Sequence, residues 1–212
     1  MEFRPDGSVL VQTALSMSRL SHEELSREAA DIARLVRLTL GGDSTAFEQI
    51  IVRYETRVMT VAARLLGGRE DARDVAQEVF LRAFKYLHRL DLDKPVEPWL
   101  MRITVNVCRD AMRRKQRRWN TFVEVEPPDT IGHSADQYAG LARKQERQIL
   151  QRALDCLPEK ERLAIVLRDV EGLSTAEVAS ILHSSETTVR SQVSRGRLRL
   201  KAAIHRFMGG EP

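Results

Sequence analysis

One stretch near the C-terminal end carries polar side chains whose types and spacing suit contact with nucleic acid. One side of a predicted helix carries Arg190, Ser194, Arg197 and Lys201, with Arg195 beyond them. Arginine can pair bidentately with guanine, and serine can reach a base or a phosphate. The alternative is an ordinary solvated basic face, which a charged helix taken alone would usually be. The elements that position these residues favour DNA contact.

A short helix and a turn precede this stretch. Ser174 and Glu177 form a capping box, in which each side chain satisfies a free backbone N–H of the first helix. The sequence His183-Ser184-Ser185 interrupts the apolar pattern, and its last serine can cap the next helix. That next helix has an apolar stripe on a different side from its basic residues, made of Val189, Val193, Gly196 and Leu200. The pattern predicts a helix-turn-helix whose second helix suits the DNA major groove.

A second basic block lies in the middle of the chain. Residues 102–118 contain seven Lys or Arg against one acid, and residues 186–206 contain six against one. The segment Glu124–Asp129 between the two blocks is acidic. Two basic blocks separated by an acidic connector indicate one polyanion that is touched at two places.

Composition excludes several classes of function. The two cysteines, Cys108 and Cys156, are far apart, and there is no signal peptide or long apolar run, so we expect a reducing, cytoplasmic setting. No cluster has the spacing of a metal site, so we expect neither a metal nor a cofactor. Glu124 and Glu126 are paired carboxylates without a rigid frame, and no phosphate loop or nucleophile elbow is present. We therefore expect no enzymatic activity.

Helical periodicity in the first half predicts four helices, separated by Gly41-Gly42, Gly67-Gly68 and the proline-containing loop Leu90–Pro98. The third of them is predicted to turn Phe80 and Phe84 inward. The fold class is all-α, with two small helical domains joined by a flexible linker. The division is residues 1–20 as an N-terminal tail, 21–118 as the first domain, 119–134 as an acidic linker, 135–208 as the helix-turn-helix domain and 209–212 as a C-terminal tail.

Ordered motifs run through both predicted domains. The first domain contains GDSTAFEQIIVRYETRV, DARDVAQEVFLRAFKYL and WLMRITVNVCRDAMRR, and the second contains LPEKERLAIVLRDVEGLSTAEVASIL and ETTVRSQVSRGRLRLK. In this order they resemble the bacterial sigma factors of RNA polymerase, specifically the extracytoplasmic-function (ECF) group. The resemblance covers about Leu25–Ile204. It implies that residues 21–118 are a sigma-2 domain and residues 135–208 a sigma-4 domain.

The resemblance implies a polymerase-binding face on the third helix. Asp74, Gln77 and Glu78 match the family positions that bind the coiled-coil clamp of the largest polymerase subunit. A polar, acid-bearing stripe suits a basic helical partner. Spacing alone would favour an ordinary solvated face, and the family match reverses that preference.

The resemblance also implies residues for the −10 promoter element. Asn106 matches a position used on this element, and an amide can read a base edge. The loop above it, with Asp91, Asp93 and Lys94, resembles the loop that holds a flipped-out base. Trp99 could stack on a base, although its apolar spacing favours a place in the core. The backbone phosphates are assigned to Arg102, Arg109, Arg113, Arg114 and Lys115.

For the −35 element, the matching positions are Arg190, Ser191, Ser194 and Arg195, whereas Arg197 and Lys201 are assigned to phosphates. The chain departs from the family at His183, where relatives often carry glycine. Histidine tolerates a left-handed conformation better than most residues, at some cost.

The function that the resemblance implies is promoter recognition, promoter melting and transcription initiation at stress- or envelope-responsive genes. The implied partners are core RNA polymerase (the clamp of the largest subunit and the flap of the second largest), promoter DNA and an anti-sigma factor, with no small-molecule substrate. The free chain is expected to be a monomer. The alternative is a free-standing helix-turn-helix regulator with an N-terminal sensing or dimerisation domain, which would read palindromic half-sites. The second basic helix, Arg102–Arg118, weighs against that alternative.

Overall fold

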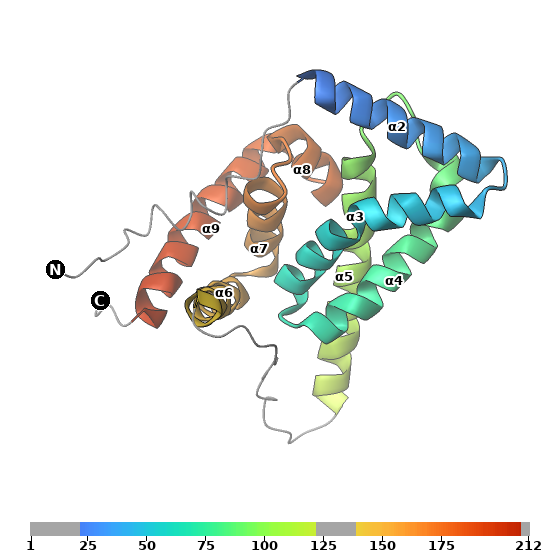
Figure 1. Cartoon of the computed structure of the whole chain (residues 1–212). Helices are drawn as coiled ribbons and strands as arrows, with labels where there is room; N and C mark the ends of the chain where they lie inside the picture. Colours follow the sequence, from blue (N-terminus) through green and yellow to red (C-terminus); the bar gives the residue numbers. More distant parts are fainter. Residues whose placement is uncertain (1–21, 122–138, 209–212) are drawn as a thin grey trace.

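The computed structural model describes residues 22–121 and 139–208. Within these ranges every regular element is a helix and no strand is present (Figure 1), which confirms the all-α prediction. The elements are α2 (His22–Leu40), α3 (Ser44–Leu66), α4 (Arg69–Tyr86), η1 (Leu87–Arg89, a 3₁₀ turn), α5 (Val96–Thr121), α6 (Ala139–Asp155), α7 (Glu159–Ile165), η2 (Val166–Val170, a π-helical turn), α8 (Thr175–Leu182) and α9 (Glu186–Phe207).

The predicted tails, residues 1–20 and 209–212, lie outside the described residues, as does most of the predicted linker 119–134. Helix α5 continues through Thr121, three residues past the predicted end of the first domain. None of the described helices is long and apolar enough to cross a membrane.

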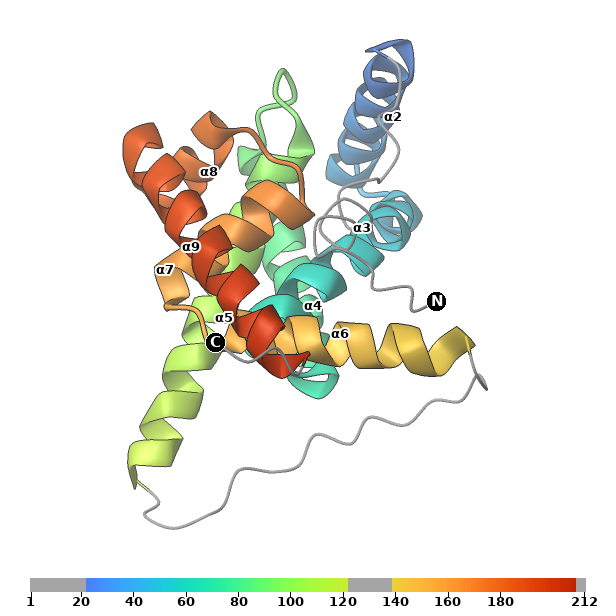
Figure 2. The ribbon, with the colours of Figure 1, turned by 90° about the vertical axis from the view of Figure 1, so that its left-hand side faces the viewer.

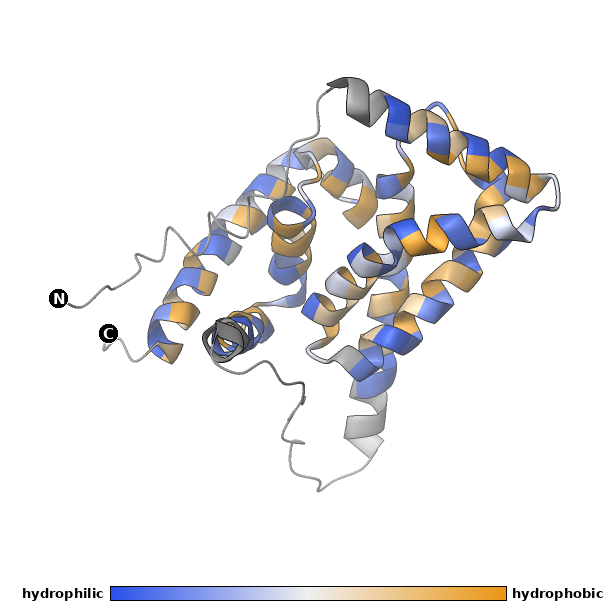
Figure 3. Ribbon diagram, in the orientation of Figure 1, coloured by the Kyte–Doolittle hydropathy of each residue, from blue (hydrophilic) through white to orange (hydrophobic). Residues whose placement is uncertain are grey.

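Helices α2–α5 form the first bundle, and α3 lies at its centre. Helix α3 contacts α2, α4 and α5. Its inner face is a stripe at helical spacing, which includes Ile50, Tyr54, Val58, Val61 and Leu65. Figure 3 shows hydrophobic and hydrophilic residues alternating along the helices of this bundle, as expected of amphipathic helices that share one core.

Phe84 is exposed, contrary to the prediction. Its side chain is 53% exposed, whereas Phe80 and Ala83 are buried. The ring of Phe84 stands edge-on to that of Phe47, with 5.0 Å between the ring centroids. Phe84 follows Ala83 by one residue, a rotation of about 100° around the helix, and this places it at the edge of the buried stripe.

Helices α6–α9 form the second bundle, in which α9 packs against α7. Gly196 allows the two helices to approach closely. A Cβ atom at this position would lie 2.8 Å from Cγ1 of Ile165 and 3.4 Å from the backbone oxygen of Glu161. Ile165 is itself buried, so its β-branched side chain has little room to move away.

We expect Gly196→Ala to lower the free energy of unfolding of the second bundle. Alanine favours a helix by about 1 kcal/mol over glycine, but overpacking a core costs typically 1–3 kcal/mol. A net loss of about 1 kcal/mol should appear in urea denaturation followed by circular dichroism. Ala202→Gly is the control for helix propensity alone, because Ala202 is exposed on the same helix. A Gly196 variant as stable as the parent would contradict the close-packing argument.

The predicted helix-turn-helix is confirmed, and its ends are capped by the expected side chains. The backbone N–H of Ser174 donates to Oε2 of Glu177 at 2.7 Å, and the backbone N–H of Glu177 donates to Oγ of Ser174 at 3.2 Å. The Oγ of Ser185 accepts the backbone N–H of Thr188 at 3.1 Å and so caps α9. Between the two helices, His183 is left-handed, with φ 52° and ψ 53°.

We expect His183→Gly to stabilise the chain slightly. The left-handed conformation costs a non-glycine residue roughly 1–2 kcal/mol, and the greater unfolded-state entropy of glycine offsets about 0.5–1 kcal/mol of the relief. The free energy of unfolding should therefore rise by about 0.5 kcal/mol in urea denaturation. Gly172→Ala should shift it the other way, because Gly172 has φ +70° with no atom near its added Cβ. A destabilised His183→Gly would show that the imidazole makes a contribution of its own.

The two bundles pack against each other (Figure 1). Nε of Arg57 donates to Oε2 of Glu171 at 2.5 Å, and Nη2 of Arg57 donates to the backbone oxygen of Glu171 at 3.0 Å. Nε2 of Gln151 donates to the backbone oxygen of Arg64 at 3.3 Å. Burial raises the pKa of Glu171 above its usual value, against the opposing effect of the Arg57 charge. Buried apolar residues of both bundles belong to one continuous core.

Candidate nucleic-acid and polymerase interfaces

Helix α9 turns its predicted base-reading residues outward. Val189 and Val193 are buried against the rest of the second bundle. The four residues predicted to meet the −35 element are all exposed: Arg190, Ser191, Ser194 and Arg195. The caps fix where this helix begins, and its apolar stripe fixes which side is turned inward. The sequence pattern thus places these side chains correctly, and their role at the −35 element stays a prediction.

Several arginines of α9 are held by acids of the same bundle. Nη2 of Arg190 donates to Oε2 of Glu186 at 2.8 Å, one turn away on the same helix. Arg197 makes two hydrogen bonds to the carboxylate of Asp169, at 2.8 and 2.5 Å, which raise the pKa of its guanidinium. Arg197 therefore tethers α9 to η2. Lys201, the other predicted phosphate contact, is exposed.

Glu161 is a functional candidate that the sequence reading did not single out. Glu161 is buried. Its Oε2 lies 2.8 Å from Nη1 of Arg199, and its Oε1 lies 3.5 Å from Nε of Arg195. A buried carboxylate needs such partners, because an unpaired charge is costly to desolvate. The sequence feature that could have pointed to Glu161 is the i, i+4 spacing of Arg195 and Arg199, which places two cations on one helix face.

The predicted DNA contacts on α5 fall into an exposed group and a half-buried group. Asn106, Arg113, Arg114 and Lys115 are exposed, whereas Arg102 and Arg109 are half-buried because they meet the second bundle. Figure 2 shows the last turns of α5 projecting beyond the other helices of its bundle. The ammonium of Lys115 lies 3.1 Å from Oδ2 of Asp71.

The two half-buried arginines of α5 bind polar groups of the second bundle. Nη2 of Arg102 donates to Oγ of Ser180 on α8 at 2.7 Å. Nε of Arg109 donates to Oε1 of Glu159 on α7 at 3.2 Å. In this arrangement both guanidinium groups are already engaged, so a phosphate would have to displace these contacts.

The loop before α5 is exposed and closed on itself. Oδ1 of Asp91 accepts the backbone N–H of Asp93 at 3.1 Å, and Oδ2 of Asp91 lies 2.7 Å from the ammonium of Lys94. These contacts lower the pKa of Asp91 and raise that of Lys94. Trp99, just inside α5, is partly buried and packs against the core, as its spacing favoured.

The predicted polymerase-binding residues lie on the outer side of α4. Asp74 and Gln77 are exposed, and Glu78 is half-buried. Oε1 of Glu78 accepts a hydrogen bond from Nε of Arg82 at 2.6 Å, and Nη1 of Arg82 also reaches Oδ2 of Asp110 on α5 at 3.3 Å. Arg82 thus connects a predicted polymerase contact with the DNA-facing helix.

Leu81 and Phe84 extend this face with apolar surface. Leu81 is 60% exposed and Phe84 is 53% exposed. They follow Gln77 by four and seven residues, the spacing of one helix face. Exposed large apolar side chains beside acids mark a surface that suits a partner with apolar and basic groups. Because Phe84 was predicted to face inward, this exposed apolar surface was not predicted from the sequence.

Two features bear on the expected absence of a reactive thiol and a metal in the described part of the chain, namely the burial of Cys108 and the arrangement of the His, Cys, Asp and Glu residues. Cys108 is buried, and burial raises the pKa of its thiol to about 12, which keeps it protonated at neutral pH. Residues 22–121 and 139–208 contain no group of three or more His, Cys, Asp or Glu that could hold a metal ion.

Comparison with known families matches both bundles. Residues 50–118 match the model of Sigma-70 region 2, and residues 147–200 match that of Sigma-70, region 4. The chain is 34% identical over 170 residues to the ECF RNA polymerase sigma-E factor of Escherichia coli (strain K12), covering 77% of this chain and 88% of that protein. It is 28% identical over 180 residues to the ECF RNA polymerase sigma factor SigW of Bacillus subtilis (strain 168), covering 82% and 96%.

Solved structures agree with these matches. CnrH, in complex with the cytosolic domain of CnrY, superposes with a TM-score of 0.59 at 26% identity, covering 81% of this chain and 96% of CnrH. The sigma factor RpoE from Bartonella quintana, in complex with the anti-sigma factor NepR, also gives 0.59 at 25% identity, covering 74% and 96%. With two helical bundles that match region 2 and region 4 in order, the chain belongs to the ECF group of RNA polymerase sigma factors.

Proposed function

We propose that this sigma factor docks on core RNA polymerase through α4 and reads the two parts of a promoter with α5 and α9. As a sigma factor it directs promoter-specific initiation of transcription. The observation that carries the residue assignment is the pair of polar helix faces on separate bundles. Asn106 and Arg113 are exposed on α5, and Arg190 and Ser194 are exposed on α9.

The face on α4 supports binding to the clamp of the largest polymerase subunit. Asp74 and Gln77 supply exposed polar groups, and Leu81 and Phe84 supply exposed apolar area beside them. A buried apolar contact ringed by polar groups is the usual anatomy of a specific protein interface. On the second bundle, the 69% exposed Leu198 of α9 supports a further contact with the flap of the second largest subunit.

The packing of the bundles supports a change of arrangement when polymerase binds. Arg102 and Arg109 face the second bundle and are engaged by Ser180 and Glu159. A promoter strand on α5 needs these guanidinium groups, so the bundles have to separate before the −10 contact is complete. Separation breaks the ion pair of Arg57 with the buried Glu171 and exposes apolar core shared by both bundles, so contacts with polymerase have to offset this cost.

The same arrangement supports control by an anti-sigma factor. Of the two solved neighbours, one is described with an anti-sigma factor and the other with the cytosolic domain of a partner. The wider proposal is that the free chain is a monomer and acts in the cytoplasm, where core polymerase is found. It initiates transcription without itself catalysing a reaction.

Run-off transcription tests this function directly. Purified core polymerase with the full chain, on a library of promoter fragments, should yield discrete start sites that require both components. The chain alone should leave the same duplexes unbound at physiological salt. Two-fold symmetric footprints from the chain alone, without stimulation of core, would instead identify a free-standing regulator.

A further inference from the structure

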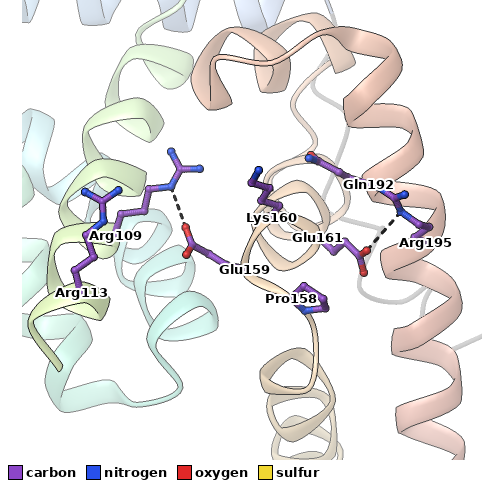
Figure 4. Close-up of a pocket in the computed structure, with 8 residues that line it drawn as sticks. All are labelled: Arg109, Arg113, Pro158, Glu159, Lys160, Glu161, Gln192 and Arg195. Atoms are coloured by element: carbon purple, nitrogen blue, oxygen red, sulfur yellow. Dashed lines mark hydrogen bonds and ion pairs between the residues drawn. The ribbon is translucent and has the colours of Figure 1, made fainter. Parts of the chain in front are cut away.

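A cleft of about 610 Å³ opens between the two bundles. Arg109 and Arg113 of α5 line one side, Gln192 and Arg195 of α9 line the other, and Lys160 of α7 lies between them (Figure 4). The volume is within the usual range for small-molecule sites. Three helices from two bundles thus direct polar side chains into one space.

The cleft is cationic, because each of its acidic side chains is already paired with arginine. Its lining includes four basic residues and two acidic ones. The carboxylate of Glu159 accepts a hydrogen bond from Arg109 at 3.2 Å. The carboxylate of Glu161 is shared by Arg199, at 2.8 Å, and Arg195, at 3.5 Å. Neither acid is therefore available to neutralise a further cation.

Arg113 and Lys160 are the cations that remain. Both are exposed at the mouth of the cleft, and neither has a carboxylate partner among the described residues. They come from different bundles and line the same cleft, with Arg109 between them (Figure 4). Arginine and lysine are the residues that bind phosphate, the former through bidentate hydrogen bonds and the latter as a point charge.

Gln192 supplies a buried amide oxygen that has no partner. The residue is only 7% exposed, and its Oε1 makes no hydrogen bond in the structure. Figure 4 shows its amide end directed toward the cleft. A buried polar group without a partner is uncommon and requires an explanation. A side-chain amide offers one acceptor and two donors, so it can read the edge of a nucleobase.

We propose that this cleft binds a free polyphosphorylated nucleotide. Its phosphates lie between Arg113 and Lys160, and its base presents a hydrogen-bonding edge to the amide of Gln192. A polyphosphate supplies several negative charges to cations that belong to both bundles, so binding holds the bundles together. A donor on the base accounts for the unpartnered amide oxygen, which phosphate alone leaves without a donor.

Nucleotide binding opposes promoter binding. Arg109, Arg113 and Arg195 are among the DNA contacts assigned above, and a ligand in the cleft covers them. This regulatory consequence rests on the proposed function, whereas the binding site itself does not. Binding to the free chain and transcription by the holoenzyme can therefore succeed or fail independently.

Isothermal titration calorimetry on the full chain tests the site, in a buffer without divalent cations. The probes are ATP, inorganic triphosphate and a ten-nucleotide single strand of DNA. ATP should bind more tightly than triphosphate. Lys160→Ala should raise the dissociation constant for ATP at least tenfold, because Lys160 is exposed and its loss leaves the fold intact. Arg206→Ala, which removes one exposed cation at the far end of α9, should change it less than twofold.

Gln192→Leu isolates the contribution of the base. It should bring the affinity for ATP down to that for triphosphate while the affinity for triphosphate is kept, and circular dichroism checks that the variant is folded. No heat with ATP, or equal ATP affinity in Lys160→Ala and the parent, would overturn the site. Triphosphate binding as tightly as ATP to the parent would overturn the nucleotide assignment. Binding of the DNA strand without binding of ATP would show that the cleft is a path for promoter DNA instead.

Discussion

Replacing Gln77 and Glu78 together by alanine should remove most of the affinity of this sigma factor for core RNA polymerase. A hot-spot residue costs about 2 kcal/mol or more when truncated, so one such residue in this pair gives a loss of about 30-fold or greater. The first bundle should stay folded, because Gln77 is exposed and Glu78 is only half-buried. Arg82 keeps its second partner, Asp110, so the substitution leaves no isolated buried charge. Fluorescence anisotropy of a labelled chain titrated with core measures the loss.

Glu55→Ala is the matched control for this experiment. Glu55 is an exposed carboxylate on the neighbouring helix α3, so its removal changes the net charge by the same amount. Its affinity for core should stay within twofold of the parent. If the double variant also binds core as tightly as the parent, the polymerase contact does not lie on this face of α4.

Arg190→Ala and Lys201→Ala should weaken promoter binding in two different ways. Arg190 is exposed near the N-terminal end of α9, where helix-turn-helix proteins place their base contacts. Its loss should cost roughly 1–3 kcal/mol and relax the preference at one position of the −35 element. It also releases the carboxylate of Glu186, which then stands unpaired toward the DNA. Lys201 lies about three turns further on, so its ammonium should meet a phosphate.

The comparison belongs in the holoenzyme, against a panel of −35 variants at several salt concentrations. Lys201→Ala should weaken binding about equally on every sequence and reduce the salt slope by about one. Each variant loses one positive charge, so the pair separates base reading from general attraction. Equal losses across the whole panel for Arg190→Ala would make it a phosphate contact and leave base reading to Ser191, Ser194 and Arg195.

The parts of this fold that depend only on residues close in sequence could be predicted. The Ser174–Glu177 cap, the Ser185 cap and the left-handed His183 are all decided within a few residues, and each has the predicted form. The prediction that Phe84 faces inward was wrong, because helical spacing does not decide which of two adjacent residues lies at the edge of a buried stripe.

Features between the bundles could not be predicted in the same way. The engagement of Arg102 and Arg109 depends on how two bundles distant in sequence meet. Helical periodicity describes one helix at a time and carries no information about how the two bundles pack. The basic block of α5 was therefore read correctly as a charged surface, although two of its arginines are contacts within the protein.

Arg82 is a single counter-ion shared by two carboxylates, one of them Glu78 on the proposed polymerase face and the other Asp110 on α5, the helix proposed to meet DNA. If a polymerase cation pairs with Glu78, the guanidinium of Arg82 belongs to Asp110 alone. Asp110 is the one acid among residues 102–118, so its neutralisation makes the potential that DNA meets more positive. Because linkage is reciprocal, we expect DNA on α5 to strengthen the polymerase contact by the same factor. This redistribution of charge within the first bundle would couple the two binding events in addition to the proposed separation of the bundles.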